Sequence, residues 1–278
     1  MHTMTKELFS IEDKVIFVTG ALGQIGREIS KNFLLQKAKV VYADIDLSKQ
    51  PEIEAELLKL GIKEDDFLFV KIDISKEQEC INAVKQTVEN FGKIDVLINN
   101  AAIDAKFDNE NSSKVNQSRF EFYPIDLLTH AVNVNLIGTI IITQVICRQF
   151  LKQKYGNIIN VASTYSIVSP NQNLYDFGDG VQNYKPIDYI ASKSFIPNFT
   201  RYLATFYAQD GIRANAIVPH GIFNNHPEPF LINWAKLSPL GRMCNREELN
   251  GPFTFLASSA SSYMTGSIVM VDGGWTAW

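Results

Sequence analysis

The sequence is poor in cysteine, glycine and proline, and it carries no strong excess of charge of either sign. Its three cysteines (Cys80, Cys147 and Cys244) are odd in number and widely separated, which excludes a disulfide framework and predicts a reducing compartment. Sixteen glycines and ten prolines in 278 residues exclude a collagen-like or linker-rich chain. The formal net charge is −4, so no overall positive field would hold nucleic acid or an anionic membrane.

Long apolar runs are also missing. Residues 1–14 are polar and lack the apolar core of a signal peptide. The most apolar long stretch, 131–151, is interrupted by polar residues, whereas a membrane span needs about 20 predominantly apolar ones. The four histidines show no metal-ligand spacing. We therefore expect a soluble, cytoplasmic protein that needs no metal and binds neither nucleic acid nor membrane.

Short β-branched runs alternate with segments of helical period, which is typical of a parallel sheet covered on both faces. The expected strands are 14–19, 39–44, 67–72, 94–98, 157–161, 213–218 and 267–271. The expected helices are 23–36, 51–60, 75–91, 124–154, 187–209 and 246–257. The pattern predicts one doubly wound α/β domain over residues 1–278, a Rossmann fold with a seven-stranded, mostly parallel sheet.

Two of the expected helices carry local signals. Ser75 is a candidate N-cap for helix 75–91, with Gln78 three residues later as the partner of a capping box. Pro197 lies inside helix 187–209 and should kink it, because proline removes one backbone hydrogen bond.

Three connections are longer than usual: 103–123, 164–188 and 223–241. All follow the carboxyl ends of strands, where open α/β sheets bind ligands. The first two are rich in Asn, Ser, Gln and Asp, and the second contains Tyr165, Tyr175 and Tyr184. This composition predicts a polar, sugar-like small-molecule substrate, although loops that simply lie on the surface would also be polar.

A glycine-rich turn separates the first expected strand from the first helix. It reads Gly20-Ala21-Leu22-Gly23-Gln24-Ile25-Gly26. Glycines at such a turn let the backbone approach a pyrophosphate, which then lies at the N-terminus of the helix. The alternative is an ordinary tight turn, but the position within a strand–helix–strand unit favours a dinucleotide.

Carboxylates follow the second and third expected strands. Asp44 could accept both ribose hydroxyls of NAD and would repel the 2′-phosphate of NADP, so NAD is the predicted cofactor. Asp44 could instead be a solvated residue that caps the next turn. Asp73 could receive an adenine amino group or form a local turn beside Ser75, and the sequence leaves both open.

Tyr189 and Lys193 are four residues apart, so on a helix they lie on one face, one turn from each other. An ammonium group beside a phenol stabilises the phenolate and lowers the phenol pKa from about 10 toward neutrality. Taken alone, the pair could also be a surface contact.

Together these residues resemble the short-chain dehydrogenase/reductase family over nearly the whole chain. Further matching motifs are Asn99-Asn100-Ala101-Ala102, Asn135 within 134–138, Ser163 within 160–163, Pro219-His220-Gly221-Ile222 and the ending Val271-Asp272-Gly273-Gly274. Within that family the chain is similar to dehydrogenases of flagellin-modification and legionaminic-acid-type sugar pathways. It departs from the family pattern at Gln24, Ala102, Pro197 and His220, and we expect His220 to be a packing residue.

The resemblance implies hydride transfer between NAD(H) and a secondary alcohol or ketone. Tyr189 would be the general acid/base, Lys193 would assist it and bind the nicotinamide ribose, Ser163 would hydrogen-bond the substrate oxygen, and Asn135 would hold a water that relays protons. Cofactor contacts are expected from Gly20, Gln24, Ile25, Gly26, Asp44, Asp73, Ile74, Asn100, Ala101, Tyr189, Lys193, Pro219, Gly221 and Ile222.

The resemblance also implies a homo-oligomer, a tetramer or a dimer, because family members commonly pair the helices that correspond to 124–154 and 187–209. Two other functions stay open. One is a 3-oxoacyl-thioester reductase or another reductase of small carbonyl compounds, against which Asp44 and the polar loops argue. The other is a non-catalytic dinucleotide-binding regulator, although all four expected catalytic positions are filled.

Overall fold

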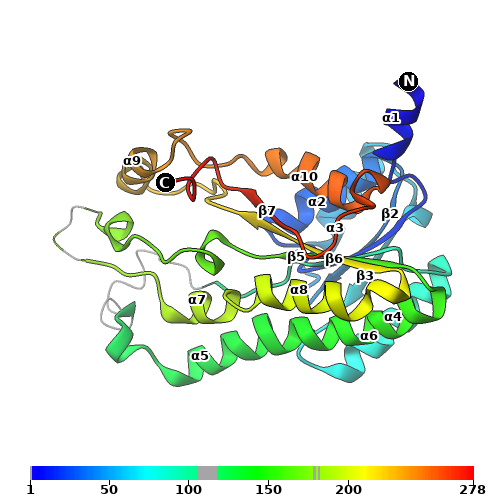
Figure 1. Cartoon of the computed structure of the whole chain (residues 1–278), viewed down its shortest axis with the longest axis horizontal. Coiled ribbons are helices and arrows are strands. Elements are labelled where there is room, and N and C mark those ends of the chain that lie inside the picture. Colours follow the sequence, from blue (N-terminus) through cyan, green and yellow to red (C-terminus); the bar gives the residue numbers. More distant parts are fainter. Residues whose placement is uncertain (1, 105–117, 178–179, 181) are drawn as a thin grey trace.

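The computed structural model describes residues 2–104, 118–177, 180 and 182–278. Seven strands form one sheet in the order β3-β2-β1-β4-β5-β6-β7, and every neighbouring pair is parallel (Figure 1). The strands are β1 (Val15–Thr19), β2 (Lys39–Asp44), β3 (Phe67–Lys71), β4 (Val96–Asn99), β5 (Gly156–Val161), β6 (Ile212–Pro219) and β7 (Ile268–Val271). The predicted doubly wound, seven-stranded α/β fold is confirmed, and the order of the strands reverses between β1 and β4.

Helices cover both faces of this sheet. They are α1 (His2–Leu8), α2 (Gln24–Leu35), α3 (Gln50–Lys59), α4 (Glu77–Phe91), α5 (Ile125–Val132), α6 (Thr139–Gln153), α7 (Ile187–Lys193), α8 (Ile196–Tyr207), α9 (Glu228–Leu237) and α10 (Asn250–Ala257). In Figure 1, α2, α3 and α10 lie above the sheet, and α4, α6 and α8 lie below it.

Strand residues alternate between two hydrophobic cores. Ile16 and Val18 of β1 pack with residues of α2, α3 and α10, whereas Phe17 packs with residues of α4, α6 and α8. Because successive strand side chains point to opposite faces, a strand buried on both sides is apolar throughout. This explains why continuous apolar runs identified the strands in the sequence.

The predicted capping box before α4 is wrong. The Ser75 backbone N–H and hydroxyl both donate to Oδ1 of Asp73, at 2.9 and 2.7 Å. Gln78 donates to Oδ1 of Asn82 at 3.1 Å instead. The Asp73 carboxylate is a stronger acceptor and engages the serine, so α4 begins only at Glu77.

The segment 223–241, predicted to be irregular, contains the helix α9. Its prolines misled the sequence analysis, because proline is compatible with the first turn of a helix, where Pro229 lies. Phe230 and Trp234 of α9 are buried against Tyr175 and Trp275 in a third apolar cluster.

Two long helices are irregular where the site lies. The predicted helix 124–154 consists of α5, a π-helical segment Asn133–Gly138 and α6. The predicted helix 187–209 is divided into α7 and α8 at residues 194–195, with Pro197 in the first turn of α8. In place of the expected kink within one helix, the structure has an interruption between two helices just before this proline.

A chain of buried polar side chains crosses the sheet. Nδ2 of Asn99 on β4 donates to Oγ1 of Thr143 on α6 and to Oδ1 of Asn160 on β5, both at 2.8 Å. Nδ2 of Asn160 donates to Oγ1 of Thr200 on α8 at 2.9 Å. All four side chains are buried, so the loss of one partner leaves another polar group unsatisfied.

We therefore expect Thr200→Val to lower the free energy of unfolding by about 1–3 kcal/mol, because Asn160 loses its acceptor. Thr205→Val is the matched control: Thr205 lies on the same helix and bonds the carbonyl four residues earlier in the same way, but it is exposed. Urea denaturation of both variants is the measurement. Equal losses in the two variants would contradict the role given to the buried chain of hydrogen bonds.

Candidate active site

The glycine turn packs directly against the residues that follow β4. Gly20 has a φ of +62°, and a Cβ added there would lie 2.7 Å from Cα of Ala101. A Cβ on Gly26 would lie 2.2 Å from the carbonyl oxygen of Gly20. Nδ2 of Asn100 donates to the carbonyls of Thr19 and Gly20 at 3.0 and 2.9 Å. The expected cofactor residues Asn100 and Ala101 thus hold the turn itself.

The N-terminus of α2 fits the phosphate group of a dinucleotide. Its N-cap, Gly23, makes no side-chain cap, and its first turn carries no acidic residue. Such an end presents backbone N–H groups and the positive pole of the helix dipole. Gln24 donates from Nε2 to the carbonyl of Phe223 at 2.7 Å, and Ile25 packs against the core beneath.

The two candidate carboxylates lie at the carboxyl ends of β2 and β3. Oδ2 of Asp44 accepts from the backbone N–H of Leu22 at 2.9 Å, so this carboxylate lies beside the glycine turn. Asp73 forms the local turn with Ser75 described above, so the second of its two interpretations is confirmed, while an adenine contact stays a prediction. Ile74 is buried and packs against Gly138, where a Cβ would lie 2.8 Å from its Cγ1.

The segment after β6 is shaped by an aromatic cluster. Pro219 ends β6, Gly221 has a φ of +54°, and Ile222 pairs with Cys244. A Cβ on Gly221 would lie 1.9 Å from the ring of Trp234, so only glycine fits there.

His220 is a packing residue, as expected. Its ring lies 4.3 Å from the ring centroids of both Trp234 and Trp275, and Nδ1 is hydrogen-bonded to the Thr164 hydroxyl. Within the described part of the chain, its buried Nε2 has no partner. Burial lowers the pKa of His220 to about 3, so the ring is neutral at physiological pH. A cavity of about 390 Å³ adjoins it, but none of the four expected catalytic side chains lines this cavity.

The four expected catalytic residues come from β5, α7 and the π-helical segment. Ser163 follows β5, and its side chain lies close enough to Tyr189 of α7 to lower the pKa of that phenol. Nζ of Lys193 donates to the carbonyl of Val161 at 2.9 Å and lies 6.0 Å from the centroid of the Tyr189 ring. The structure therefore brings Ser163, Tyr189 and Lys193 together at the carboxyl end of β5.

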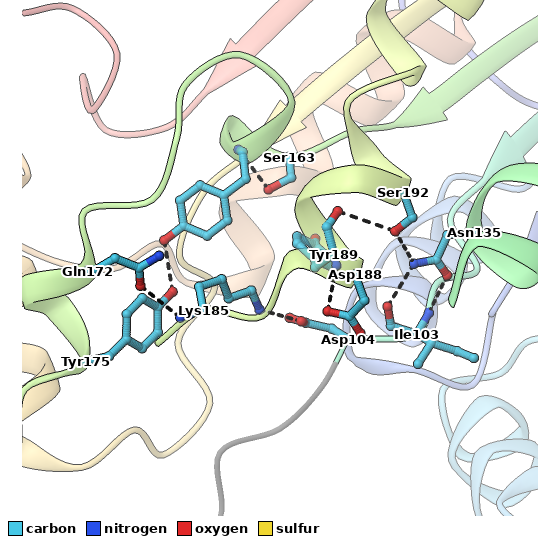
Figure 2. A network of polar contacts seen from close by, with 11 residues as sticks. Ile103, Asp104, Asn135, Ser163, Gln172, Tyr175, Lys185, Asp188, Tyr189 and Ser192 are labelled. Carbon is cyan, nitrogen blue, oxygen red and sulfur yellow. Dashed lines mark hydrogen bonds and ion pairs between the residues drawn. The ribbon is translucent and has the colours of Figure 1, made fainter. Parts of the chain in front are cut away.

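Asn135 is held rigidly behind this group. Its Oδ1 accepts from the N–H of Ile103 at 2.7 Å, and its Nδ2 donates to the carbonyl of Ile103 at 2.9 Å and to Oγ of Ser192 at 2.8 Å (Figure 2). Ser192 in turn donates to the carbonyl of Tyr189 at 3.3 Å. The π-helical segment thus links the end of β4 to α7, and π-bulges are frequent at functional sites.

The chain's own residues do not lower the pKa of Tyr189 as expected. Burial raises the pKa of Tyr189 well above its ordinary value, the nearby Asp104 carboxylate raises it further, and the Ser163 hydrogen bond lowers it. Burial also lowers the pKa of Lys193 to about 8. The prediction relied on the ammonium beside the phenol, whereas burial disfavours the charged form of both groups.

Two charged residues beside Tyr189 were missed. Nζ of Lys185 lies over the Tyr189 ring, 4.5 Å from its centroid, and forms an ion pair with Asp104 (Figure 2). Lys185 precedes α7, so helical spacing gave no signal, and Asp104 comes from the segment after β4. Figure 2 also shows Tyr175 beside this group, with its hydroxyl 3.0 Å from that of Tyr165.

Of the expected loop 103–123, residues 105–117 lie outside the described residues. The loop 164–188 is confirmed as a long connection, and its described residues contain two short 3₁₀ turns. Among the described residues, no group of three or more His, Cys, Asp or Glu side chains could hold a metal ion.

Comparisons with known proteins agree with this geometry. A family model described as enoyl-(acyl carrier protein) reductase matches residues 20–276. The post-translational flagellin modification protein A of Campylobacter coli is 28% identical over 95% of this chain and 99% of its own length. The 2-dehydro-3-deoxy-D-gluconate 5-dehydrogenase of Dickeya dadantii is 30% identical over 99% of this chain and 100% of its own.

The chain is also similar to a solved structure. The short chain dehydrogenase from Leptospira borgpetersenii, crystallised with bound NAD+, superposes with a TM-score of 0.82 and 31% identity. The match covers 96% of this chain and 94% of that one.

Proposed function

The chain belongs to the short-chain dehydrogenase/reductase family of oxidoreductases. We propose that it transfers hydride between NAD(H) and a secondary alcohol or ketone of a sugar or nucleotide sugar. The reaction would belong to the biosynthesis of a surface glycan of the nonulosonic acid type. The observation that carries the proposal is the group formed by Tyr189, Ser163 and Lys193 at the carboxyl end of β5. The Ser163 hydroxyl and the Tyr189 phenol lie beside each other, so both can reach one substrate oxygen.

The residues around the glycine turn fit a nicotinamide dinucleotide. The uncapped N-terminus of α2 would hold the pyrophosphate, and Asp44 would accept the ribose hydroxyls. Asp73, Ile74, Pro219, Gly221 and Ile222 would contact the rest of the cofactor. When bound, the cofactor supplies the hydride acceptor or donor.

The chain's own residues handle the proton and the developing charge. In alcohol oxidation, Tyr189 takes the hydroxyl proton, because hydride cannot leave the carbinol carbon unless that proton is also removed. Ser163 donates a hydrogen bond to the substrate oxygen. Lys193 favours the Tyr189 phenolate and would bind the nicotinamide ribose. Asn135 would hold a water that passes protons on from Lys193.

A sugar-like substrate is supported by two observations. The surroundings of Tyr189 are polar: Asp104, Lys185 and the paired hydroxyls of Tyr165 and Tyr175 lie near it, and Gln172 accepts a hydrogen bond from the backbone of Lys185 (Figure 2). Hydroxyl-rich ligands need such groups, while aromatic faces cover their C–H surfaces. Two of the relatives also carry names from flagellin modification and sugar-acid oxidation.

A reductase of acyl thioesters is the second candidate, because the matching family model is described by such an activity. The polar side chains beside Tyr189 argue against it, since an acyl chain would need an apolar wall.

An absorbance assay of NAD(H)-linked turnover on nucleotide sugars, free sugars and acyl thioesters tests the proposal. We expect the wild type to turn over a member of the sugar classes. We expect Tyr189→Phe to lose about 10²–10⁴-fold in kcat at unchanged cofactor affinity, because only the transferable proton is removed. Tyr155→Phe is the control, since that phenol contacts Lys14 instead of the site. Failure of every sugar, with an acyl thioester reaching a kcat/KM of about 10⁴ M⁻¹s⁻¹, would favour the second candidate.

Asp44 should make NADH bind at least about 10-fold tighter than NADPH, because the carboxylate repels the 2′-phosphate. Asp44→Asn should reduce this difference, and Asp46→Asn, which removes the neighbouring carboxylate that bonds Ser48, should not. Fluorescence titration with both nucleotides measures it. Equal affinities in the wild type would show that Asp44 does not face the ribose.

We also propose a cytoplasmic homo-oligomer, most simply a tetramer of paired dimers. The three cysteines are free, as in a reducing compartment. The helix Ile125–Gln153 is long and apolar enough to cross a membrane by length and composition alone, but residues of its α6 part pack in the core beneath the sheet. Only 28% of its most apolar stretch is buried within one chain, so much of its apolar surface is left for a partner to cover. Exposed apolar side chains lie along it and along α8, namely Ile125, Leu127, Ile137, Leu151, Tyr202 and Phe206.

A second copy would cover this surface. We expect light scattering at micromolar concentration to report a multiple of 31.3 kDa, and replacement of Tyr202 and Phe206 by serine to shift the mass downward. A wild-type mass of one chain would contradict the assembly.

A further inference from the structure

Two lysines, not one, lie near the Tyr189 phenol. Nζ of Lys185 is 4.5 Å from the ring centroid, and Nζ of Lys193 is 6.0 Å from it. Lys193 comes from the same helix as Tyr189, whereas Lys185 comes from the end of the loop 164–188. The closer cation is therefore the one that the helical spacing did not predict.

The position of Lys185 is fixed by the protein. Its backbone N–H donates to Oε1 of Gln172 at 2.9 Å, and its side chain is only 8% exposed. Its ion-pair partner is Asp104, whose side chain is 49% exposed (Figure 2). The ammonium group thus lies over the ring, whereas the carboxylate lies toward solvent.

These two charges act on Tyr189 in opposite directions. A cation over an aromatic face is attracted to the ring, and more strongly once the ring carries the negative charge of a phenolate. The Asp104 carboxylate opposes that charge and raises the pKa of Tyr189. Because the Lys185 side chain is only 8% exposed, the effect of its charge is stronger than it would be in water.

The other groups that face Tyr189 are few among the described residues. From the 3₁₀ turn after β5 come Ser163 and Tyr165, and from the loop before α7 comes Tyr175. From α7 itself come Lys193 and Asp188, and the Asp188 carboxylate accepts from the Tyr189 N–H at 2.7 Å. This carboxylate also raises the pKa of Tyr123, which precedes α5. Among the charged groups near Tyr189 in the described part of the chain, Lys185 and Asp104 are the two that form an ion pair with each other.

We propose that the Lys185–Asp104 ion pair sets the acidity of Tyr189, with Lys185 favouring the phenolate and Asp104 opposing it. Lys185 is thus a positioning residue that tunes the general base of the proposed reaction, and the inference rests on the role of Tyr189 in the proposed function. A substrate that draws Asp104 away from Lys185 would leave the ammonium unneutralised and strengthen the base in the loaded site.

The test is the pH dependence of kcat for alcohol oxidation by four proteins: wild type, Lys185→Met, Asp104→Asn and the double variant. We expect the kinetic pKa to rise by about one unit in Lys185→Met and to fall by about one unit in Asp104→Asn. The double variant should return near the wild-type value, and Lys185→Arg should restore it. If the pair only fastened the loop, both single variants would lose activity without opposite shifts, and that result would overturn the proposal.

A second measurement separates this inference from the proposed function. The near-ultraviolet absorbance of the Tyr189 phenolate can be titrated without any substrate, with Tyr189→Phe as the background to subtract. We expect Asp104→Asn to develop this absorbance at a lower pH than the wild type. If no sugar is turned over but this shift is seen, the proposed function fails and the ion pair keeps its role. If sugars are turned over and no shift is seen, the ion-pair inference alone fails.

Discussion

Thr19 and Asn100 clamp the two halves of the sheet together at the point where the strand order reverses. The Thr19 hydroxyl accepts from the backbone N–H groups of Asn100 and Ala101, both at 3.0 Å, and the Asn100 amide donates to the turn in return. This contact is possible only because Gly20 and Gly26 lack a Cβ. It holds the N-terminus of α2, where a phosphate would bind, against the end of β4, from which Ile103 reaches Asn135. The cofactor side and the catalytic side of the site therefore share one rigid junction.

The catalytic side depends on irregular helices. A regular α-helix through Asn133–Gly138 would direct the side chains differently, and the π-helical segment lets Asn135 bond both Ile103 and Ser192. The helix is interrupted before Pro197, so α7 ends at Lys193 and α8 begins at Ile196. The short helix that carries Tyr189 is therefore separate from α8. The buried amides and hydroxyls on β4, β5, α6 and α8 are linked by hydrogen bonds to one another, whereas Oδ1 of Asn99 has no partner within the described part of the chain.

Burial determines the resting electrostatics of the site. It holds the proton on Tyr189 and lowers the pKa of Lys193 to about 8, so burial opposes the ionisation that the proposed role of Tyr189 requires. A positive charge near the phenol, or movement of the Asp104 carboxylate away from it, would lower the pKa of Tyr189. In the Lys185–Asp104 pair, the lysine side chain is nearly buried and the carboxylate side chain is about half exposed.

The sequence by itself determined the parallel sheet, because strands buried on both faces must be continuously apolar, and it determined the glycine turn, Asp44 and the Tyr189–Lys193 face, because these depend on local spacing. It missed α9, whose prolines suggested a loop, and it misplaced the start of α4, where the Asp73 carboxylate competes for Ser75. Only the tertiary structure decided the ionisation of Tyr189, because burial and the ion pair between Asp104 and Lys185 both arise on folding. Asp104 and Lys185 are 81 residues apart in the sequence. Charges that meet through folding leave no periodic trace in a sequence, whereas a helix face or a glycine turn does.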